Sequence, residues 1–443
     1  MAYNHFKIPQ VDHLILLVGS NPLPNLVVAD VLVKDDGAIY LLHTKETKEI
    51  AKRLKYRIAA RKTDKSNKIF LHNISEDGDR SPTAKSIKNE IIKIVSPISE
   101  GTIGLNYTGG TKFMGVHSYL ALERLKKENV NFQFSYLDAS SMSVVVMDQN
   151  GEATCSLRNK VKITLDDMIF IHGWKYHTDK KPKTKPVNKE VAEYILKIMQ
   201  KRNDNDASDW KKYRNCLHNI RKENNGAPKK KNQLFAISPE EQIVPNILSK
   251  LRNEPYTESD NIQFKIEGWK KAEDVFKWME GNWLEDLTMD VIQQLEFKHN
   301  DESFTFDETG LGANLERNKG SKIEPKIEPK IESKIEIDVY GIIDFQFFLF
   351  SVTTDATKGL CKSKLMEAYV RARQLGGDEA CVALVCLANE KTVKEVGEEL
   401  QSLFQGSGSK IRVFGIDDWT PKDDHEMEIF SKIRNWVSTI INQ

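Results

Sequence analysis

Short apolar runs alternate with amphipathic segments over the first 175 residues. Residues 11–18 (VDHLILLV) form a short apolar run typical of a strand that is buried on both faces of a parallel sheet. The same pattern predicts strands at 38–43, 132–137 and 144–147, and helices at 45–56, 82–95 and 111–127. Strands and helices in this order indicate a doubly wound parallel sheet.

A second α/β unit is predicted from about residue 260. Its pattern gives a helix at 274–297, strands at 336–339 and 345–352, and a helix at 362–375 that Gly376 and Gly377 end. A strand at 380–388, a helix at 391–404, a strand at 410–414 and a final helix follow. Residues 322–336 repeat Lys-Ile-Glu-Pro with small variations. Because proline at this spacing excludes a helix, we expect an extended segment without a functional role there.

The segment between the two units is polar and rich in lysine. Residues 177–190 carry prolines and predict a linker, and helices are expected near 191–201 and 238–254. The run at 228–231 (PKKK) has two interpretations, a solvated loop or a contact with nucleic acid, of which the first is the simpler. The chain is therefore divided into residues 1–177, 178–260 and 261–443.

Composition narrows the class of protein. The 443 residues suffice for two or three domains, and 65 Lys and Arg nearly balance 64 Asp and Glu, so any nucleic-acid binding must come from a local patch. No apolar run reaches membrane-spanning length and the first residues lack a signal-peptide core, so a cytoplasmic protein is expected. Five cysteines without a CxxC pair predict free thiols and no zinc site.

Two polar turns carry the first candidate site. Residues 19–25 (GSNPLPN) directly follow the first strand, and residues 106–112 (NYTGGTK) lie about eighty residues later. Open α/β sheets bind ligands in glycine-containing turns at the carboxyl ends of their strands. Hydroxyls, backbone amides and one lysine suit phosphate or ribose oxygens, so the two turns together predict a pocket for a nucleotide-like ligand.

Acidic residues of the second unit suggest a different chemistry. Cleavage of a phosphodiester is helped by clustered carboxylates that hold a divalent cation, often with a lysine. Glu285 lies on the first helix of the unit, and Glu336 and Asp338 alternate with apolar residues on the next strand, so both acids share one face. Ser351 and Thr353 share a face at the end of the following strand. Each residue alone fits a solvated surface, but their order together favours a catalytic centre.

Five segments in this order resemble a known combination of domains. They are GSNPLPN and NYTGGTK, then NWLED at 282–286, EIDV at 336–339 and KLMEAYVRARQLGGDEA at 364–380. The first half resembles a CARF domain, the Rossmann-like sensor of cyclic oligoadenylates, and the second resembles the PD-(D/E)xK restriction-endonuclease superfamily. The whole resembles the CRISPR ancillary nucleases of type III systems, which are homodimers switched on by cyclic tetra-adenylate.

The resemblance implies an α/β protein in which a Rossmann-like CARF domain (1–177) is joined through a connecting region (178–260) to a restriction-endonuclease-like domain (261–443). It implies a metal-dependent nuclease of antiviral defence that acts on DNA, single-stranded RNA or both. Glu285 matches the helix acid and Asp338 the central metal-binding aspartate, so these two residues are expected to hold Mg²⁺ or Mn²⁺. Two sensor domains related by a dyad would offer a symmetric ligand two equivalent half-sites.

The catalytic pattern has a gap. Where the family has an acidic or polar residue, a spacer and a lysine, this chain has Ser351-Val352-Thr353. We predict that Lys364 replaces the missing lysine, because it lies one turn before Ala368 on the sheet-packing side of its helix. Lys358 is the second choice, and the simpler interpretation of Lys364 is a side chain at the rim of the core.

By the same resemblance the sensor residues line the cyclic nucleotide site. The two turns contribute Ser20, Asn21, Pro22, Asn25, Asn106, Thr108, Gly109, Gly110, Thr111 and Lys112. His43, Thr44 and Lys45 follow the second strand and could form a side wall.

Two alternatives remain open. A ligand-responsive transcriptional regulator would need a helix-turn-helix in the C-terminal half, but the break at Gly376-Gly377 leads into an apolar strand. A degenerate nuclease fold kept for binding is suggested by the displaced lysine. The sequence also leaves open the preference for DNA or RNA, the ring size of the activator, and whether the sensor degrades it.

Overall fold

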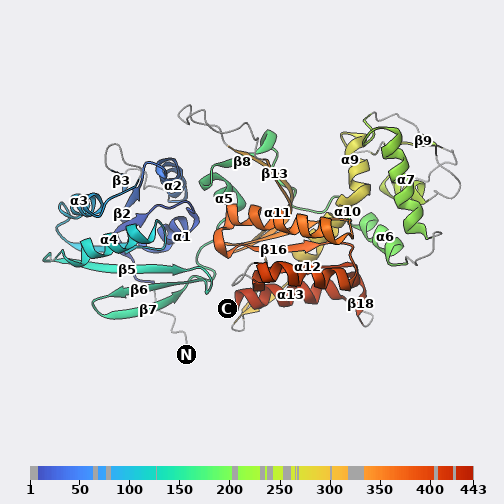
Figure 1. The fold of residues 1–443 in the computed structure, drawn as a ribbon. Helices are drawn as coiled ribbons and strands as arrows, with labels where there is room; N and C mark the ends of the chain where they lie inside the picture. The colour runs from blue at the N-terminus through green and yellow to red at the C-terminus, as the bar shows by residue number, and fades with distance from the viewer. Residues whose placement is uncertain are drawn as a thin grey trace.

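The computed structural model describes residues 8–62, 68–75, 81–125, 127–201, 208–229, 235–236, 243–252, 261–264, 266, 269–299, 302–317, 334–403, 408–422 and 426–442. Three parts lie in a row along the molecule, as Figure 1 shows. A seven-stranded sheet is at one end, a six-stranded sheet is in the middle, and a small helical lobe is at the other end. No helix among these residues is long and apolar enough to cross a membrane.

The first sheet is doubly wound, as predicted. Its strand order is β3-β2-β1-β4-β5-β6-β7, and the strands from β3 to β5 are parallel. The strands are β1 (Val11–Leu17), β2 (Val33–His43), β3 (Ile69–Asn73), β4 (Gly101–Asn106), β5 (Val130–Asp138), β6 (Ser143–Asp148) and β7 (Gly151–Ser156). Strands β6 and β7 extend the sheet in antiparallel fashion. The winding reverses between β1 and β4, so their carboxyl ends flank the crevice in which open α/β sheets bind ligands.

Helices cover both faces of this sheet. They are α1 (Leu23–Val31), α2 (Lys48–Arg61), α3 (Ala84–Val95) and α4 (Lys112–Glu123). Helices α1 and α2 pack in one apolar cluster, and α3 and α4 pack in another. Helix α3 begins after Thr83, its N-cap, and not at residue 82 as predicted. The reason is a capping box, in which Thr83 and Ser86 each accept a hydrogen bond from the backbone N–H of the other.

The second sheet has the order β17-β16-β15-β14-β13-β8. Its strands are β8 (Trp174–Tyr176), β13 (Glu308–Arg317), β14 (Lys334–Ile343), β15 (Gln346–Val352), β16 (Cys381–Val385) and β17 (Ile411–Phe414). Edge strand β8 lies within residues 1–177. The range predicted as the first domain therefore contributes a strand to the second sheet. Residues 322–333 of the predicted extended repeat lie outside the described residues, and its last residues, 334–336, belong to β14.

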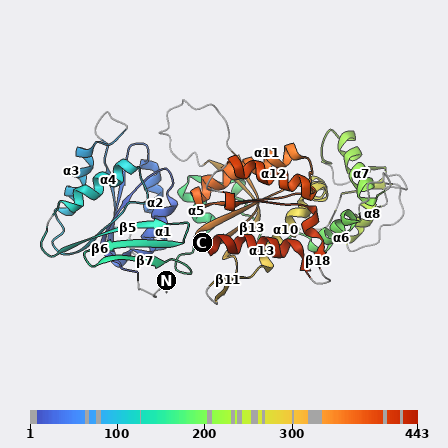
Figure 2. The ribbon, with the colours of Figure 1, turned by 60° about the horizontal axis from the view of Figure 1, so that its bottom comes forward.

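Figure 2 shows helices on both sides of the second sheet. Helices α11 (Lys358–Gly376) and α12 (Glu390–Leu403) cover one face, and α10 (Trp283–Gln294) and α13 (Glu428–Ile441) cover the other. The helix expected at 274–297 is instead α9 (Ala272–Lys277), a π-helical turn (Trp278–Asn282) and α10. It ends at Gln294 because the chain becomes extended at Leu295 and enters strand β11 (Phe297–His299).

The helical lobe consists of α6 (Lys189–Gln200), α7 (Asp209–Glu223) and α8 (Ile243–Arg252), with the short strands β9 (Phe235–Ala236) and β10 (Asn261–Ile262). Its apolar side chains join the cluster that also contains α10 and α13. The lobe therefore packs on the helix that carries Glu285.

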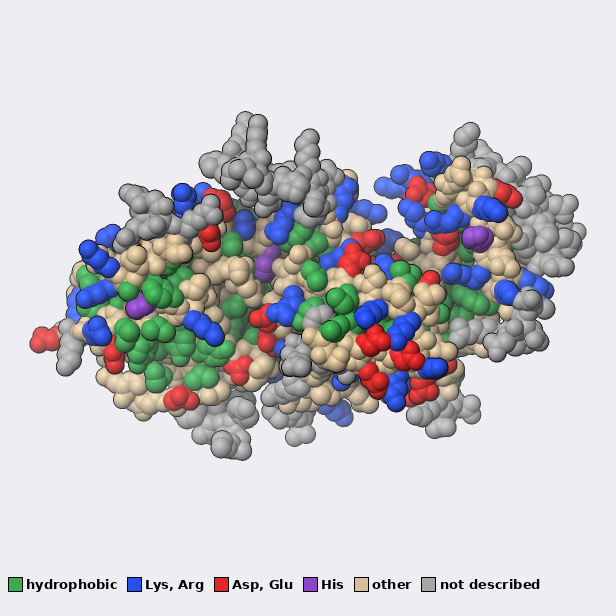
Figure 3. Space-filling view, in the orientation of Figure 1, with side chains coloured by type: hydrophobic (Ala, Val, Ile, Leu, Met, Phe, Trp, Pro, Cys, Tyr) green, Lys and Arg blue, Asp and Glu red, His purple; other side chains and the backbone are tan. Residues whose placement is uncertain are grey.

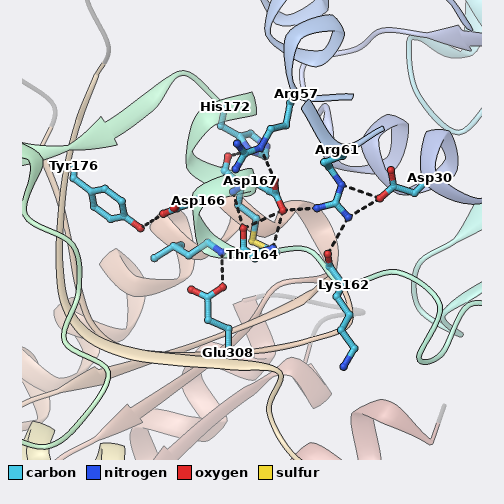
Figure 4. A network of polar contacts seen from close by, with 12 residues as sticks. Asp30, Arg57, Arg61, Lys162, Thr164, Asp166, Asp167, His172, Tyr176 and Glu308 are labelled. Carbon is cyan, nitrogen blue, oxygen red and sulfur yellow. Dashed lines mark hydrogen bonds and ion pairs between the residues drawn. The ribbon is translucent and has the colours of Figure 1, made fainter. Parts of the chain in front are cut away.

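A polar network joins the two sheets through α5 (Leu165–Ile171), as Figure 4 shows. Arg61 on α2 donates to Asp30 on α1 at 2.6 Å and to Asp167 on α5 at 2.7 Å. The backbone N–H of Leu165 donates to Glu308 on β13 at 3.1 Å. One continuous apolar cluster runs from α1 and α2 through α5 to α11 and α12. The first and second sheets therefore share a core.

Candidate functional site

The two glycine-containing turns meet at the reversal of the first sheet. A Cβ on Gly19 would lie 2.9 Å from the backbone nitrogen of Gly110, and one on Gly109 would lie 2.2 Å from the carbonyl oxygen of Leu17. Gly110 has a φ of 73°, which favours glycine. Both turns therefore need glycine for close backbone approach, and the motifs that the sequence singled out separately form one structure.

A cavity of about 400 Å³ opens beside these turns. Five of the predicted ligand residues line it, namely Ser20, Asn21, Thr108, Gly109 and Gly110. The end of β5 and the turn after it add the segment from Tyr136 to Ser140, and the second unit adds Phe345, Gln346, Gly376, Asp378 and Glu379. The pocket thus has walls from both units, which the sequence analysis did not foresee.

Three other predicted residues of the turns bond to neighbouring strands or cap the next helix. Asn25 is buried and its Nδ2 donates to the carbonyl of Leu17 at 2.9 Å. Asn106 is buried, donates to Ser135 at 3.1 Å, and accepts from the backbone N–H of Thr108. Thr111 caps α4 by accepting from the backbone N–H of Met114.

The remaining predicted ligand residues also lie outside the walls of this cavity. Pro22 precedes α1, and Lys112 is exposed in the first turn of α4. His43 and Thr44 are buried, and the ring of His43 contacts the Thr44 carbonyl at 2.9 Å. Lys45 is exposed, and its backbone N–H donates to Ser75.

Asn21, in the turn after β1, contacts the second unit. Its Oδ1 accepts from the backbone N–H of Leu23 at 3.1 Å and lies 3.4 Å from Nε2 of His172. A Cβ on Gly377, which follows α11, would lie 2.2 Å from Nδ2 of Asn21. Gly377 has a φ of 71° and a ψ of −156°, a conformation that is essentially limited to glycine. The end of α11 and the turn after β1 therefore fit together only with glycine at position 377.

The acidic centre is built where α10, β14 and β15 meet. Asp338 on β14 accepts at Oδ2 from the hydroxyl of Ser351 at 3.1 Å and from the backbone N–H of Val352 at 2.8 Å. The ladder between β13 and β14 is uninterrupted except between the pairs Leu311–Val339 and Ala313–Ile337, where Gly312 has a φ of 71°. The expected alternation along β14 is confirmed from 334 to 338, since Ile335 and Ile337 are buried while Glu336 is exposed.

The pKa values indicate that the acids of this centre repel one another. Burial raises the pKa of Glu285 well above its ordinary value, and the negative charges of Asp338 and Glu336 raise it further. Burial also raises the pKa of Asp338, although the Val352 N–H and the charge of Lys364 act in the opposite direction. Carboxylates held together in this way favour sharing a proton or a cation.

The three lysines at the start of α11 have different partners. Lys364 lies close enough to Asp338 for its charge to lower the pKa of that carboxyl. Lys358 and Lys362 instead form ion pairs with Glu399 on α12, at 2.6 and 2.9 Å. Of these three lysines, only Lys364 is thus brought to the acidic centre, while Lys358, the second choice, points elsewhere.

The structure adds Lys183, which the sequence analysis missed. Its backbone N–H and C=O both pair with Leu311 on β13 at 2.9 Å, and its charge lowers the pKa of Glu285 and of Asp286. Asp286 is buried and accepts from the backbone N–H of Asn188 at 2.8 Å. The linker is therefore attached to α10, which carries Glu285, through the bond between Asn188 and Asp286. No sequence motif predicts this long-range contact.

Thr353 and Glu336, unlike Ser351, form hydrogen bonds with residues other than Asp338. The Thr353 hydroxyl accepts from the backbone N–H of Asp355 at 3.2 Å and so forms part of the loop after β15. Glu336 is exposed, and its carbonyl accepts from Arg371 at 2.7 Å.

The acidic side chains of this centre offer few ligands for a metal ion. In the part of the chain that the structure describes, no group of three or more His, Cys, Asp or Glu side chains is placed to hold one. Glu285 and Asp338 nevertheless fit Mg²⁺, which proteins often bind through one or two carboxylates with water completing the shell. A bound cation would offset the burial and the negative charges that raise both pKa values.

No family model matches the chain, and no curated protein sequence matches it. The fold, however, is known. The protein VC1899 from Vibrio cholerae superposes with a TM-score of 0.65 and 14% identity, over 97% of this chain and 99% of that chain. Can2 from Sulfobacillus thermosulfidooxidans, solved in complex with cyclic tetra-adenylate, superposes with a TM-score of 0.58 and 13% identity, over 98% of both chains.

Likeness to VC1899 and Can2 at this identity establishes the fold. The chain has an N-terminal Rossmann-like sheet and a C-terminal α/β unit in the arrangement of these proteins, and the resemblance stated from sequence is confirmed at that level. A type III CRISPR defence DNA nuclease activated by cyclic oligoadenylate gives a TM-score of 0.42 at 12% identity over 86% of this chain and 46% of that one, too low to support any inference.

Proposed function

We propose that the chain is a metal-dependent nuclease of type III CRISPR defence, activated by cyclic tetra-adenylate. The observation that carries the proposal is the convergence of Glu285 and Asp338, from separate elements, into a centre where burial and neighbouring negative charges raise both pKa values. Perturbed acids of this kind are typical of functional sites. The fold of Can2, which was solved with cyclic tetra-adenylate, supports the sensor half of the proposal.

The chain's own residues have distinct tasks in this centre. Glu285 and Asp338 would hold Mg²⁺ or Mn²⁺, which when bound supplies charge to the substrate phosphate and to water. Ser351 and the Val352 N–H fix Asp338 by donating to one of its oxygens, which leaves the other oxygen for a ligand. Lys364 brings positive charge to the place where negative charge develops as the phosphodiester breaks.

The pocket would bind the activator. Ser20, Asn21 and Thr108 offer side-chain donors, and the glycine turn offers close approach to its backbone amides, which suits the phosphates and riboses of a cyclic nucleotide. A homodimer would place two such half-sites across a dyad, which matches a symmetric ring.

Helix α11 supports a direct route between the two sites. Its carboxyl end and the turn after it form part of the pocket wall through Gly376 and Asp378, while its first half carries Lys364. A helix of 19 residues is about 28 Å long. A ligand that shifts the end of this helix would therefore shift the charge beside Asp338.

Purified protein with circular plasmid, single-stranded DNA or single-stranded RNA, Mn²⁺, and cyclic tetra-adenylate tests the proposal. Cleavage should need both the metal and the activator, and Asp338→Ala should abolish it. Cleavage that is unchanged in Asp338→Ala would show that this centre is not the nuclease site.

A second candidate function is binding without cleavage. It is favoured by Ser351 and Thr353, which stand where the PD-(D/E)xK pattern has an acid and a lysine, and by the bond that ties Ser351 to Asp338. In that case the wild-type protein binds cyclic tetra-adenylate tightly but leaves every nucleic acid intact.

A further inference from the structure

Helix α7 carries a basic stripe that the proposed chemistry does not use. Lys211, Arg214, His218 and Lys222 are exposed, and at about 100° per residue they fall within roughly 80° of the helix circumference. The opposite face buries Tyr213, Cys216, Leu217 and Ile220. With five basic and two acidic side chains, α7 has a net charge of +3.

The stripe reaches the loop after β15 through Arg214. Arg214 donates to the hydroxyl of Thr354 at 3.2 Å, and Thr354 follows β15, whose Ser351 contacts Asp338. The Thr354 hydroxyl in turn donates to the carbonyl of Glu280, just before α10. Tyr213 fastens α7 to the same turn by donating to the carbonyl of Met279 at 2.5 Å. These bonds attach α7 to the turn before α10, which carries Glu285, and to the loop after β15, which carries Ser351.

Figure 3 shows Lys and Arg side chains gathered on the lobe that carries α7. The acidic centre itself would repel a polyanion, so a substrate strand needs positive charge beside it to be held in place. Helix α7 is about 22 Å long, which matches about six nucleotides of one strand.

We propose that the stripe of Lys211, Arg214, His218 and Lys222 on α7 binds the phosphodiester backbone of a nucleic-acid strand and leads it to the acidic centre. This inference rests on the proposed function, because it names the surface that holds the substrate of that centre. Contacts of this kind go to phosphates, so they do not read the base sequence.

The test is a binding measurement without divalent cations, so that no cleavage occurs. The triple variant Lys211→Ala/Arg214→Ala/Lys222→Ala is compared with the wild type for fluorescent single-stranded DNA, single-stranded RNA and duplex DNA of mixed sequence at several salt concentrations. Loss of three phosphate contacts should flatten the slope of log K against log salt by about 2 and weaken binding about 100-fold at 0.1 M salt. The three probes decide whether the track prefers one strand or a duplex, DNA or RNA.

A matched control removes the same charge elsewhere. Lys85, Lys88 and Lys93 are exposed on α3 of the sensor, and their triple alanine variant should bind all three probes like the wild type. Equal weakening in both triple variants, or unchanged binding in the α7 variant, would overturn the proposal. The α7 variant could also bind nucleic acid normally but no longer capture an acidic protein. That result would assign the stripe to a protein partner and overturn the proposal.

The outcome is separable from that of the proposed function. A wild-type protein that binds the probes through α7 but never cleaves them with Mn²⁺ and cyclic tetra-adenylate keeps this inference and refutes the nuclease. A protein that cleaves normally after the α7 substitutions keeps the nuclease and refutes the track.

Discussion

The sensor turn can be tested with a single methyl group at Gly109. A Cβ there would lie 2.2 Å from the carbonyl oxygen of Leu17 and 2.4 Å from Oδ1 of Asn25. Neither atom can move easily, because one belongs to the backbone of a central strand and the other to a buried side chain that is bonded to that strand. Overpacking of this kind costs roughly 1–3 kcal/mol.

Gly109→Ala is therefore expected to push the turn at 106–112 away from β1 and to open the pocket wall. If most of that cost falls on the ligand-bound form, the affinity for cyclic tetra-adenylate should drop by about 10- to 100-fold. Titration calorimetry with the ligand measures the affinity, and circular dichroism at rising temperature measures any loss of stability of the free protein.

Gly115→Ala is the matched control. Gly115 lies in α4, six residues later, and a Cβ there would meet its nearest neighbour at an ordinary 3.7 Å. Alanine inside a helix is favourable by roughly 0.5–1 kcal/mol relative to glycine, so this variant should bind normally and melt no earlier. Wild-type affinity in Gly109→Ala would refute the view that this turn forms the binding wall.

Four further predictions concern the acidic centre and the junction between the two units. Lys364→Ala should slow cleavage by about 100-fold, whereas Lys362→Ala, whose parent lysine pairs with Glu399, should cleave normally in the same plasmid assay. Because the pKa of Glu285 is raised, Mn²⁺ must displace a proton, so calorimetry should show metal affinity that rises with pH, and Glu285→Gln should lose most of this dependence. Without metal, this carboxyl holds its proton in the folded state at pH values where the unfolded chain has released it, so its contribution should lower stability as pH rises above about 4.5. Arg61→Met leaves Asp30 with a missing partner and should destabilise the protein by about 2 kcal/mol, whereas Lys52→Met, which breaks an exposed pair with Glu49, should have little effect on melting.

Much of the architecture was predictable because it follows local patterns. The apolar run at 11–18 and the glycines at 19, 109 and 110 identify a buried strand and two tight turns. Parallel strands then bring the turns to one edge of the sheet. Alternation of acids with isoleucines on β14 likewise fixes which side chains leave the core. These signals lie within a few residues of each other, so sequence alone reveals them.

The parts that sequence missed depend on long-range pairing. Lys183 reaches the acidic centre only because its backbone pairs with Leu311, 128 residues later. Gln346 and Glu379 line the pocket only because the two units dock. Helix α7 is different, because its buried positions 213, 216, 217 and 220 have helical spacing, and that signal was available in the sequence.

A pocket with walls from two units has a consequence for regulation. A ligand can shift the arrangement of the two units only if it binds one arrangement more tightly than the other. A ligand held by the sensor turns alone would have no such preference, whereas one that also touches Gly376 and Asp378 would gain or lose contacts whenever α11 moves. Because the conformation of Gly377 against Asn21 is essentially limited to glycine, this contact is set by backbone shape and not by an adaptable side chain. Under the proposed function, control acts through the position of α11, because this helix carries Lys364, whose charge acts on Asp338.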